Sequence, residues 1–285
     1  VKATGNTGGG GISTGGTVVL CGDAVVKNNS STIGGGISAN SLTLSDNAVI
    51  TQNTAVNGQG GGAKIKNLHM SGGSITENEA GNQGGGVYLD RYVATGTVSE
   101  ITGGEIRGNT AKNGGGGIYL YGHWTIPETS IALHITGGSI ADNYASGYGG
   151  GIYLCGHYLE ANTGTVLKLT GGKIENNTAA TYGGGVYVVN NARLLLDGGS
   201  ITGNTAATYG GGIYYSGSQD SAADAEIYGI TIQGCTAKTG GGIYAERAGT
   251  RYYSFRLGSA DAPTVIRDNS ATAQTGGVYL TCLLY

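Results

Sequence analysis

The chain of 285 residues contains 59 glycines and two prolines, and 12% of its residues are charged, for a formal net charge of −3. Because no basic block occurs, the charge pattern gives no electrostatic support for binding to nucleic acid or to an anionic membrane surface. No apolar run is long enough to insert into a bilayer, and the glycines follow a pattern that a disordered chain would not need.

From the N-terminus onward, runs of glycine recur, and one aliphatic residue follows each run. These aliphatic anchors are Ile12, Ile37, Ala63, Val87, Ile118, Ile152, Val186, Ile213, Ile243 and Val278. They recur every 24 to 35 residues, an interval typical of solenoids. The first and last residues lie inside this repeat, so we expect the chain to be a fragment of a longer repeat protein.

An asparagine, preceded at three residues by an aliphatic residue, forms a second anchor in each repeat. The positions are Asn29, Asn53, Asn78, Asn109, Asn143, Asn177, Asn204 and Asn269, with Cys235 in the remaining place. Each asparagine stands 8 to 10 residues before the next aliphatic anchor. The length variation therefore falls in the other part of the repeat, after the glycine run.

Within a repeat, segments such as "GGGIYL" and "LHITGGSI" alternate aliphatic with other residues, the period of a strand with one buried face. The glycines and β-branched residues disfavour helix. The sequence predicts one all-β domain over residues 1–285, a right-handed parallel β-helix of about ten coils. Glycines should occupy tight turns, and the asparagines should form a ladder of amides inside turns.

The "GGGIY" and "IxxN" pairs resemble the tandem motifs of the polymorphic outer-membrane proteins, a family of bacterial autotransporter adhesins with β-helical passengers. The motifs cover nearly the whole chain, although isoleucine replaces the phenylalanine of the family's FxxN, as at Ile75 and Ile106. The resemblance implies a bacterial cell-surface β-helix and adhesion to a host.

A column of tyrosines follows the aliphatic anchors, and we expect it to point away from the core. Its members are Tyr88, Tyr119, Tyr153, Tyr187, Tyr214, Tyr244 and Tyr279. Two interpretations are open. The rings form a stacked ladder that stabilises the sheet, or they form an exposed aromatic platform for a sugar or a protein.

The variable segments, from Asp90 to Ala262, are predicted to leave from one edge of successive coils and to form a contiguous ridge. Loops on rigid scaffolds often carry function, and Tyr, Trp and Arg dominate recognition surfaces. The candidate binding residues are Tyr92, Tyr121, His123, Trp124, His157, Tyr158, Arg247, Arg251, Tyr252, Tyr253 and Phe255. The alternative is that the inserts only shield the sheet edge.

Other clusters that could carry chemistry are sparse in this sequence. His123 and His157 are expected in adjacent coils, with Cys155 and Asp90 nearby. A zinc site needs three or four ligands, and two histidines on loops are more often simply polar surface. We therefore expect no metal and no cofactor. The acids just before the asparagine column lie several coils apart. Acidic side chains from different inserts could still meet, as in β-helical polysaccharide lyases and hydrolases.

The four cysteines do not pair in this register, because disulfides need Cα atoms closer than about 7 Å. We therefore expect four free thiols, most of them buried. Cys21 is aligned with the core positions of Met70 and Leu196, and Cys235 with the asparagine column.

Taken together, these features predict a non-catalytic, monomeric adhesin or stalk on a bacterial cell surface, outside the cell. Its insert edge would bind a host protein or glycan. The alternative is a polysaccharide lyase or glycoside hydrolase of the β-helix type.

Overall fold

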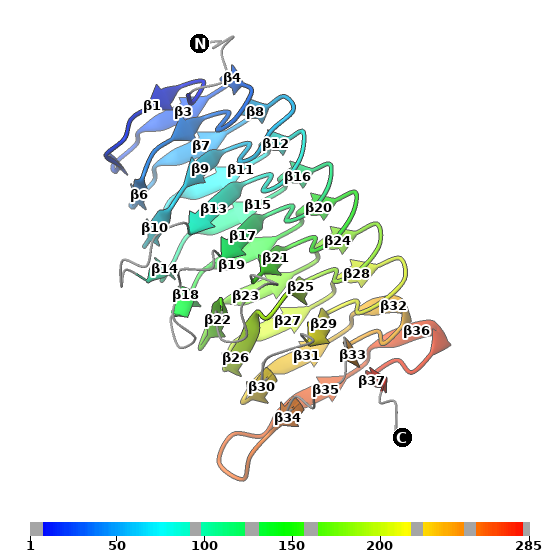
Figure 1. Ribbon diagram of the computed structural model, residues 1–285. Coiled ribbons are helices and arrows are strands. Elements are labelled where there is room, and N and C mark those ends of the chain that lie inside the picture. Colours follow the sequence, from blue (N-terminus) through cyan, green and yellow to red (C-terminus); the bar gives the residue numbers. More distant parts are fainter. Residues whose placement is uncertain are drawn as a thin grey trace.

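The computed structural model describes residues 8–91, 98–122, 131–156, 165–217, 225–247 and 255–281. Within these ranges the regular elements are all strands, and the chain winds into stacked coils whose first and last described strands lie at opposite ends of the stack (Figure 1). The strands fall into four sheets, and successive members of each sheet are every fourth strand of the chain. The predicted all-β parallel β-helix is therefore confirmed.

Sheet 1 contains ten strands and follows the glycine runs. It comprises β1 (Ile12–Ser13), β5 (Ile37–Ser38), β9 (Ala63–Ile65), β13 (Val87–Arg91), β17 (Ile118–Gly122), β21 (Ile152–Cys155), β25 (Val186–Val189), β29 (Ile213–Gly217), β33 (Ile243–Arg247) and β37 (Val278–Thr281). The aliphatic anchors are in register from strand to strand, and from Ile37 to Ile243 they are fully buried.

Sheet 2 contains nine strands and follows the variable segments. It comprises β2 (Thr17–Leu20), β6 (Ser41–Leu44), β10 (Asn67–Met70), β14 (Ser99–Ile101), β18 (Ile131–Ile135), β22 (Val166–Leu169), β26 (Arg193–Asp197), β30 (Ala225–Tyr228) and β34 (Phe255–Leu257). Alternate residues such as Leu42 and Leu44 are buried, because a strand turns every second side chain to the core.

Sheets 3 and 4 each contain nine short strands. Sheet 3 comprises β3 (Val25–Lys27), β7 (Val49–Thr51), β11 (Ser74–Thr76), β15 (Glu105–Arg107), β19 (Ser139–Ala141), β23 (Lys173–Glu175), β27 (Ser200–Thr202), β31 (Thr231–Gln233) and β35 (Val265–Arg267). Sheet 4 comprises β4 (Ser30–Ser31), β8 (Thr54–Ala55), β12 (Glu79–Ala80), β16 (Thr110–Ala111), β20 (Tyr144–Ala145), β24 (Thr178–Ala179), β28 (Thr205–Ala206), β32 (Thr236–Thr239) and β36 (Ser270–Gln274). The central residue of most sheet 3 strands, such as Ile106, enters the one apolar core that fills the coils.

The asparagine ladder lies at the corner between sheets 3 and 4, and it confirms the prediction. The Asn143 side chain shows the pattern. Its Oδ1 accepts hydrogen bonds from the backbone N–H (2.9 Å) and the Nδ2 (3.0 Å) of Asn109. Its own Nδ2 donates to Asn177 Oδ1 (2.9 Å) and to the carbonyl of Ile106 (2.9 Å). The buried amide is thus fully satisfied by groups of its neighbouring coils.

The residue before each ladder position adopts a left-handed backbone conformation. The φ angles lie between 54° and 65° at Asn28, Gln52, Glu77, Gly108, Asp142, Asn176, Gly203, Gly234 and Asp268. Glycine, asparagine and aspartate tolerate this region best. The acids of this column, such as Glu77 and Asp142, are therefore part of a turn.

The glycine runs are required by both conformation and space at the corner between sheets 4 and 1. Gly84 has a φ of 68°. A Cβ on Gly85 would lie 2.4 Å from the carbonyl oxygen of Gly116, and one on Gly86 would lie 2.7 Å from that of Gly117. Because these contacts are with the backbone of the next coil, no change of side-chain rotamer could relieve the clash that a Cβ would cause.

The cysteines differ from expectation at one position. Cys155 and Cys235 are buried free thiols, as predicted, but Cys21 is exposed. Leu20, and not Cys21, pairs with Leu44 and through it with Met70. The alignment was wrong by one residue, which moves a strand side chain to the opposite face. Cys282 lies outside the described residues.

A first prediction concerns the ladder. Asn143→Ala removes an acceptor shared by two buried donors, and each unsatisfied group costs about 1–3 kcal/mol. We expect the free energy of unfolding, measured by urea denaturation, to fall by about 4 kcal/mol, the sum of those costs. The matched change Asn47→Ala, at an exposed asparagine whose Nδ2 contacts Asp23, should change it by no more than about 0.5 kcal/mol. Equal effects would contradict a structural role for the ladder.

A second prediction repairs the ladder. Cys235 receives the Asn204 Nδ2 only at a sulfur distance of 4.0 Å, while its own N–H donates to Asn269 Oδ1 at 2.9 Å. Cys235→Asn supplies the missing amide and should raise the free energy of unfolding by about 1–2 kcal/mol, because each net hydrogen bond contributes about 0.5–1.5 kcal/mol. Cys21→Asn, at the exposed cysteine, is the control. If Cys235→Asn, but not Cys21→Asn, lowered the free energy of unfolding, the space around residue 235 would be too small for an asparagine side chain.

Candidate binding surfaces

The insert segments 92–97, 123–130, 157–164, 218–224 and 248–254 all connect a strand of sheet 1 to the next strand of sheet 2. The strands from which they leave are paired in register, with Arg91 beside Gly122 and Gly217 beside Arg247. Their described ends therefore lie along one edge of the stack, the corner between sheets 1 and 2.

One coil interrupts this edge. Between β25 and β26 the connection is only Asn190, Asn191 and Ala192, and both asparagines have positive φ angles (55° and 63°). The turn packs against the preceding coil, where Asn190 Nδ2 donates to Cys155 Sγ at 3.4 Å. The points at which the inserts leave are thus divided into a group of three and a group of two.

The candidate binding residues are described only in part. Tyr92, His123, Trp124, His157, Tyr158, Arg251, Tyr252 and Tyr253 lie outside the described residues. Arg247 is the last residue of β33. Tyr121 packs against the tyrosine column, and Phe255 packs against the core, with its ring edge-on to Tyr215 at 6.1 Å. Tyr121 and Phe255 therefore take part in packed clusters.

The tyrosine column forms a continuous stack on the outer face of sheet 1, which we call the inner row. Its successive ring centroids lie between 4.5 and 5.5 Å apart. Tyr88, Tyr119, Tyr187, Tyr214 and Tyr244 are only 4% to 9% exposed. The column points away from the core, as expected, but it is covered.

From Tyr153 to Tyr244 the column is covered by a second set of tyrosines, the outer row, formed by Tyr148, Tyr182 and Tyr209. Each directly precedes a glycine run, as in "TYGGG", and the three are linked by isolated parallel bridges. Tyr182 stacks on Tyr209 at 5.1 Å and on Tyr214 at 5.1 Å. The tyrosine before the glycine run is visible in the sequence, but sequence analysis missed it because it lies in a different register from the inner row.

This stacking decides between the two interpretations of the column. Near-parallel rings, such as Tyr214 and Tyr244 with 5° between their planes, turn their faces toward each other. The ring faces that a sugar would need are thus occupied by neighbouring tyrosines. Burial raises the pKa of Tyr119 and of Tyr214 far above the usual value, so the phenols stay protonated. The column is a stabilising ladder.

The inner row is irregular at one ring, Tyr153, which is tilted by 33° to Tyr119 and by 59° to Tyr187. In the preceding coil, the place of an outer-row tyrosine is taken by Gly114. A Cβ there would lie 2.4 Å from Cδ2 of Tyr153. The ring has moved into space that a side chain would otherwise fill.

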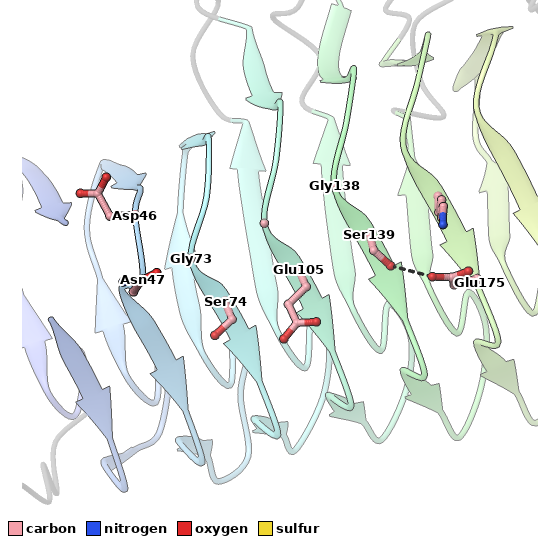
Figure 2. A pocket seen from close by; sticks show the side chains of 10 residues that line it. Asp46, Asn47, Gly73, Ser74, Glu105, Gly138, Ser139 and Glu175 are labelled. Atoms are coloured by element: carbon pink, nitrogen blue, oxygen red, sulfur yellow. Dashed lines mark hydrogen bonds between the residues drawn. The ribbon is translucent and has the colours of Figure 1, made fainter. Parts of the chain in front are cut away.

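An open groove of about 650 Å³ runs across the first residues of the sheet 3 strands (Figure 2). Its lining is Asp46, Asn47, Gly73, Ser74, Gly104, Glu105, Gly138, Ser139, Lys173 and Glu175. Ser139 Oγ donates to Glu175 Oε1 at 3.2 Å. Ser74, Glu105, Ser139 and Lys173 are in register on neighbouring strands. This surface offers hydroxyl, carboxylate and ammonium groups, and no aliphatic or aromatic side chain.

The outward column of sheet 2 is a mixed polar face. His69, Glu100, His134 and Lys168 are paired in register. Partial burial, followed by the nearby Lys168, lowers the pKa of His134, whose Nε2 lies 3.0 Å from Thr170 Oγ1. Among the described residues, no three His, Cys, Asp or Glu side chains are grouped as a metal site would require.

Comparison with protein families, curated proteins and solved structures finds no match to this chain. No helix of the described residues is long and apolar enough to cross a membrane.

A third prediction tests the packing of the two tyrosine rows. Gly114→Ala places a methyl group against the Tyr153 ring, and overpacking of this kind costs about 1–3 kcal/mol. We expect a lower free energy of unfolding in urea. Gly15→Ala, at a glycine with no atom within 4 Å of its added Cβ, is the control and should be neutral. An unchanged stability in Gly114→Ala would mean that the ring moves freely.

Proposed function

We propose that this chain is a non-catalytic rod of a bacterial cell surface that displays its insert edge to a host protein or glycan. The supporting observation is the shared edge from which the inserts leave, because paired strands hold their ends in a fixed order. A rigid scaffold with variable connections on one edge is a common arrangement for binding.

The composition of the inserts adds to this proposal. They contain the only tryptophan, Trp124, and an Arg/Tyr group around Arg251 and Tyr252. These residue types provide most of the binding energy at protein interfaces. The resemblance to autotransporter adhesin repeats agrees with a location outside the cell, and the protein is proposed to act there as a monomer.

The rod also suits the role of a stalk. Every described coil is joined to the next in four sheets, and the buried amides of the ladder run through the same stack. A spacer of this kind keeps its length because the evenly spaced hydrogen bonds of the parallel sheets connect each coil to the next along the stack.

A fourth prediction tests the insert edge. Binding of the purified chain to a glycan array and to a panel of host surface proteins is compared with that of a variant carrying Trp124→Ala, Tyr158→Ala, Arg251→Ala and Tyr252→Ala. We expect a bound ligand to be lost in the variant, since such anchors each contribute about 1–4 kcal/mol. The control carries Tyr144→Ala and Arg267→Ala, on sheets 4 and 3.

Two outcomes would contradict the proposal. Binding that persists in the insert variant but is lost in the control would move the site to another face. An absence of binding by the parent chain and both variants would leave the stalk role, with recognition carried by other parts of the protein.

One observation favours the enzymatic alternative. Glu105 and Glu175 line the same groove, two strands apart and two residues out of register, so their Cα atoms lie about 12 Å apart at the usual strand spacing and rise. Within the described chain, Glu105 makes no hydrogen bond or ion pair, whereas Glu175 accepts one from Ser139. Inverting glycosidases use two carboxyl groups about 6.5–9.5 Å apart, a distance that two glutamate side chains leaning toward each other can span from this backbone spacing. Release of reducing ends from a polysaccharide panel, abolished by Glu105→Gln but not by Glu79→Gln on sheet 4, would replace the adhesin proposal.

A further inference from the structure

The tyrosine rows form an unbroken path of aromatic contacts along the rod. From Tyr88 to Tyr279 each inner-row ring touches the next, and no centroid distance exceeds 5.5 Å. The outer row joins this path, with Tyr209 beside Tyr182 and Tyr244. Rings in such contact exchange an electron readily. An electron vacancy created on any of these tyrosines can therefore move to whichever ring holds it best.

One end of the path offers a proton acceptor. Loss of an electron makes a phenol strongly acidic, so the vacancy settles where a base can take the phenol proton. The carboxylate of Glu246 accepts hydrogen bonds from the hydroxyl groups of both Tyr214 and Tyr244, the latter at 3.3 Å. Among the described residues, this is the one carboxylate hydrogen-bonded to tyrosines of the two rows. A neutral tyrosyl radical should thus collect at Tyr214 and Tyr244.

The closest pair of rings in the two rows includes one of these tyrosines. Tyr209 and Tyr244 lie 4.4 Å apart, centroid to centroid, with 15° between their planes. The unpaired electron of a tyrosyl radical occupies orbitals perpendicular to the ring, with high density at the carbons ortho to the oxygen. Two rings that face each other can therefore form a carbon–carbon bond along the direction in which they are stacked.

We propose that the tyrosine rows are a site of oxidative self-cross-linking, in which a one-electron oxidant driven by a peroxide joins Tyr209 to Tyr244. Each phenol loses one electron to the oxidant and one proton, that of Tyr244 to Glu246 and that of the half-buried Tyr209 to solvent. The two radicals couple through their ortho carbons, and the two ring hydrogens then move to the oxygens through water. The sum is two tyrosines and one hydrogen peroxide giving one dityrosine and two waters.

Such a bond would connect neighbouring coils, because Tyr209 precedes β29 and Tyr244 lies in β33, its partner in sheet 1. It would prevent the two coils from separating and would raise the temperature of unfolding. This inference concerns sheet 1 and is independent of the proposed binding at the insert edge.

The alternative is oxidation governed only by exposure. In that case Tyr144, which is 40% exposed on sheet 4, should react first among the described tyrosines, well before Tyr244, which is 6% exposed. Tyr144 has no ring contact with either row among the described tyrosines. The two explanations thus predict cross-links at different residues.

The test uses the intact chain, a photoexcited ruthenium(II) trisbipyridyl complex and persulfate, which replaces the peroxide and accepts the two electrons as sulfate. Dityrosine fluorescence and mass spectrometry of proteolytic peptides give the yield and the position. We expect a peptide pair joined through Tyr209 and Tyr244, lighter by two hydrogens, with a yield per chain that does not change on dilution. Tyr209→Phe should abolish it, and Tyr144→Phe should leave it unchanged.

Glu246→Gln tests the base. It keeps the shape of the side chain but cannot take the proton, so the rate of cross-linking should fall about a hundredfold or more, the least that a positioned base typically contributes. Circular dichroism of each variant checks that the fold is retained. The proposal is overturned if the cross-links involve Tyr144, if they form only between molecules, or if Glu246→Gln reacts as fast as the parent chain.

Discussion

The alignment of buried amides at the corner between sheets 3 and 4 is the constraint on which the remaining structure depends. An amide such as that of Asn143 is satisfied only if the coils on both sides present their own amide and carbonyl groups in register. An unsatisfied group in this position costs more than most single contacts contribute. The path from the asparagine to the next glycine run must therefore have nearly the same length in every coil, and the glycines follow because the backbones approach too closely for a Cβ.

The same constraint determines where the sequence is free to vary. The connection between sheets 1 and 2 is separated from the ladder by a whole strand on either side, so a longer or shorter segment there does not disturb the amides. The tight turn at Asn190 and the inserts on neighbouring coils occupy equivalent places. Selection for binding can act on this edge without loss of the fold, whereas a change of length on the opposite side of the repeat would break the register.

The sequence was sufficient for the features that recur once per coil. The glycine runs, the asparagines and the alternation of apolar residues predicted the parallel solenoid, its ladder and the direction of the tyrosine column. What could not be predicted depends on contacts between coils. The predicted alignment of Cys21 was wrong by one residue, because no side chain in its own coil distinguishes the buried face of the strand from the exposed one. The outer row was missed because its three tyrosines belong to another register, and only the structure places Tyr182 over Tyr214. The groove over sheet 3 likewise combines residues of five coils.

The two tyrosine rows show how this fold turns repetition in sequence into contact in space. Parallel strands lie about 4.8 Å apart, close to the separation at which aromatic rings stack, so an identical ring on successive coils meets its neighbour without further adjustment. Order in one row depends on the other, since Tyr153 tilts beside Gly114, where no outer-row side chain is present. The chemistry of these phenols therefore belongs to the rows and not to individual residues. A base placed beside two of them, as Glu246 is, acts on the whole stack.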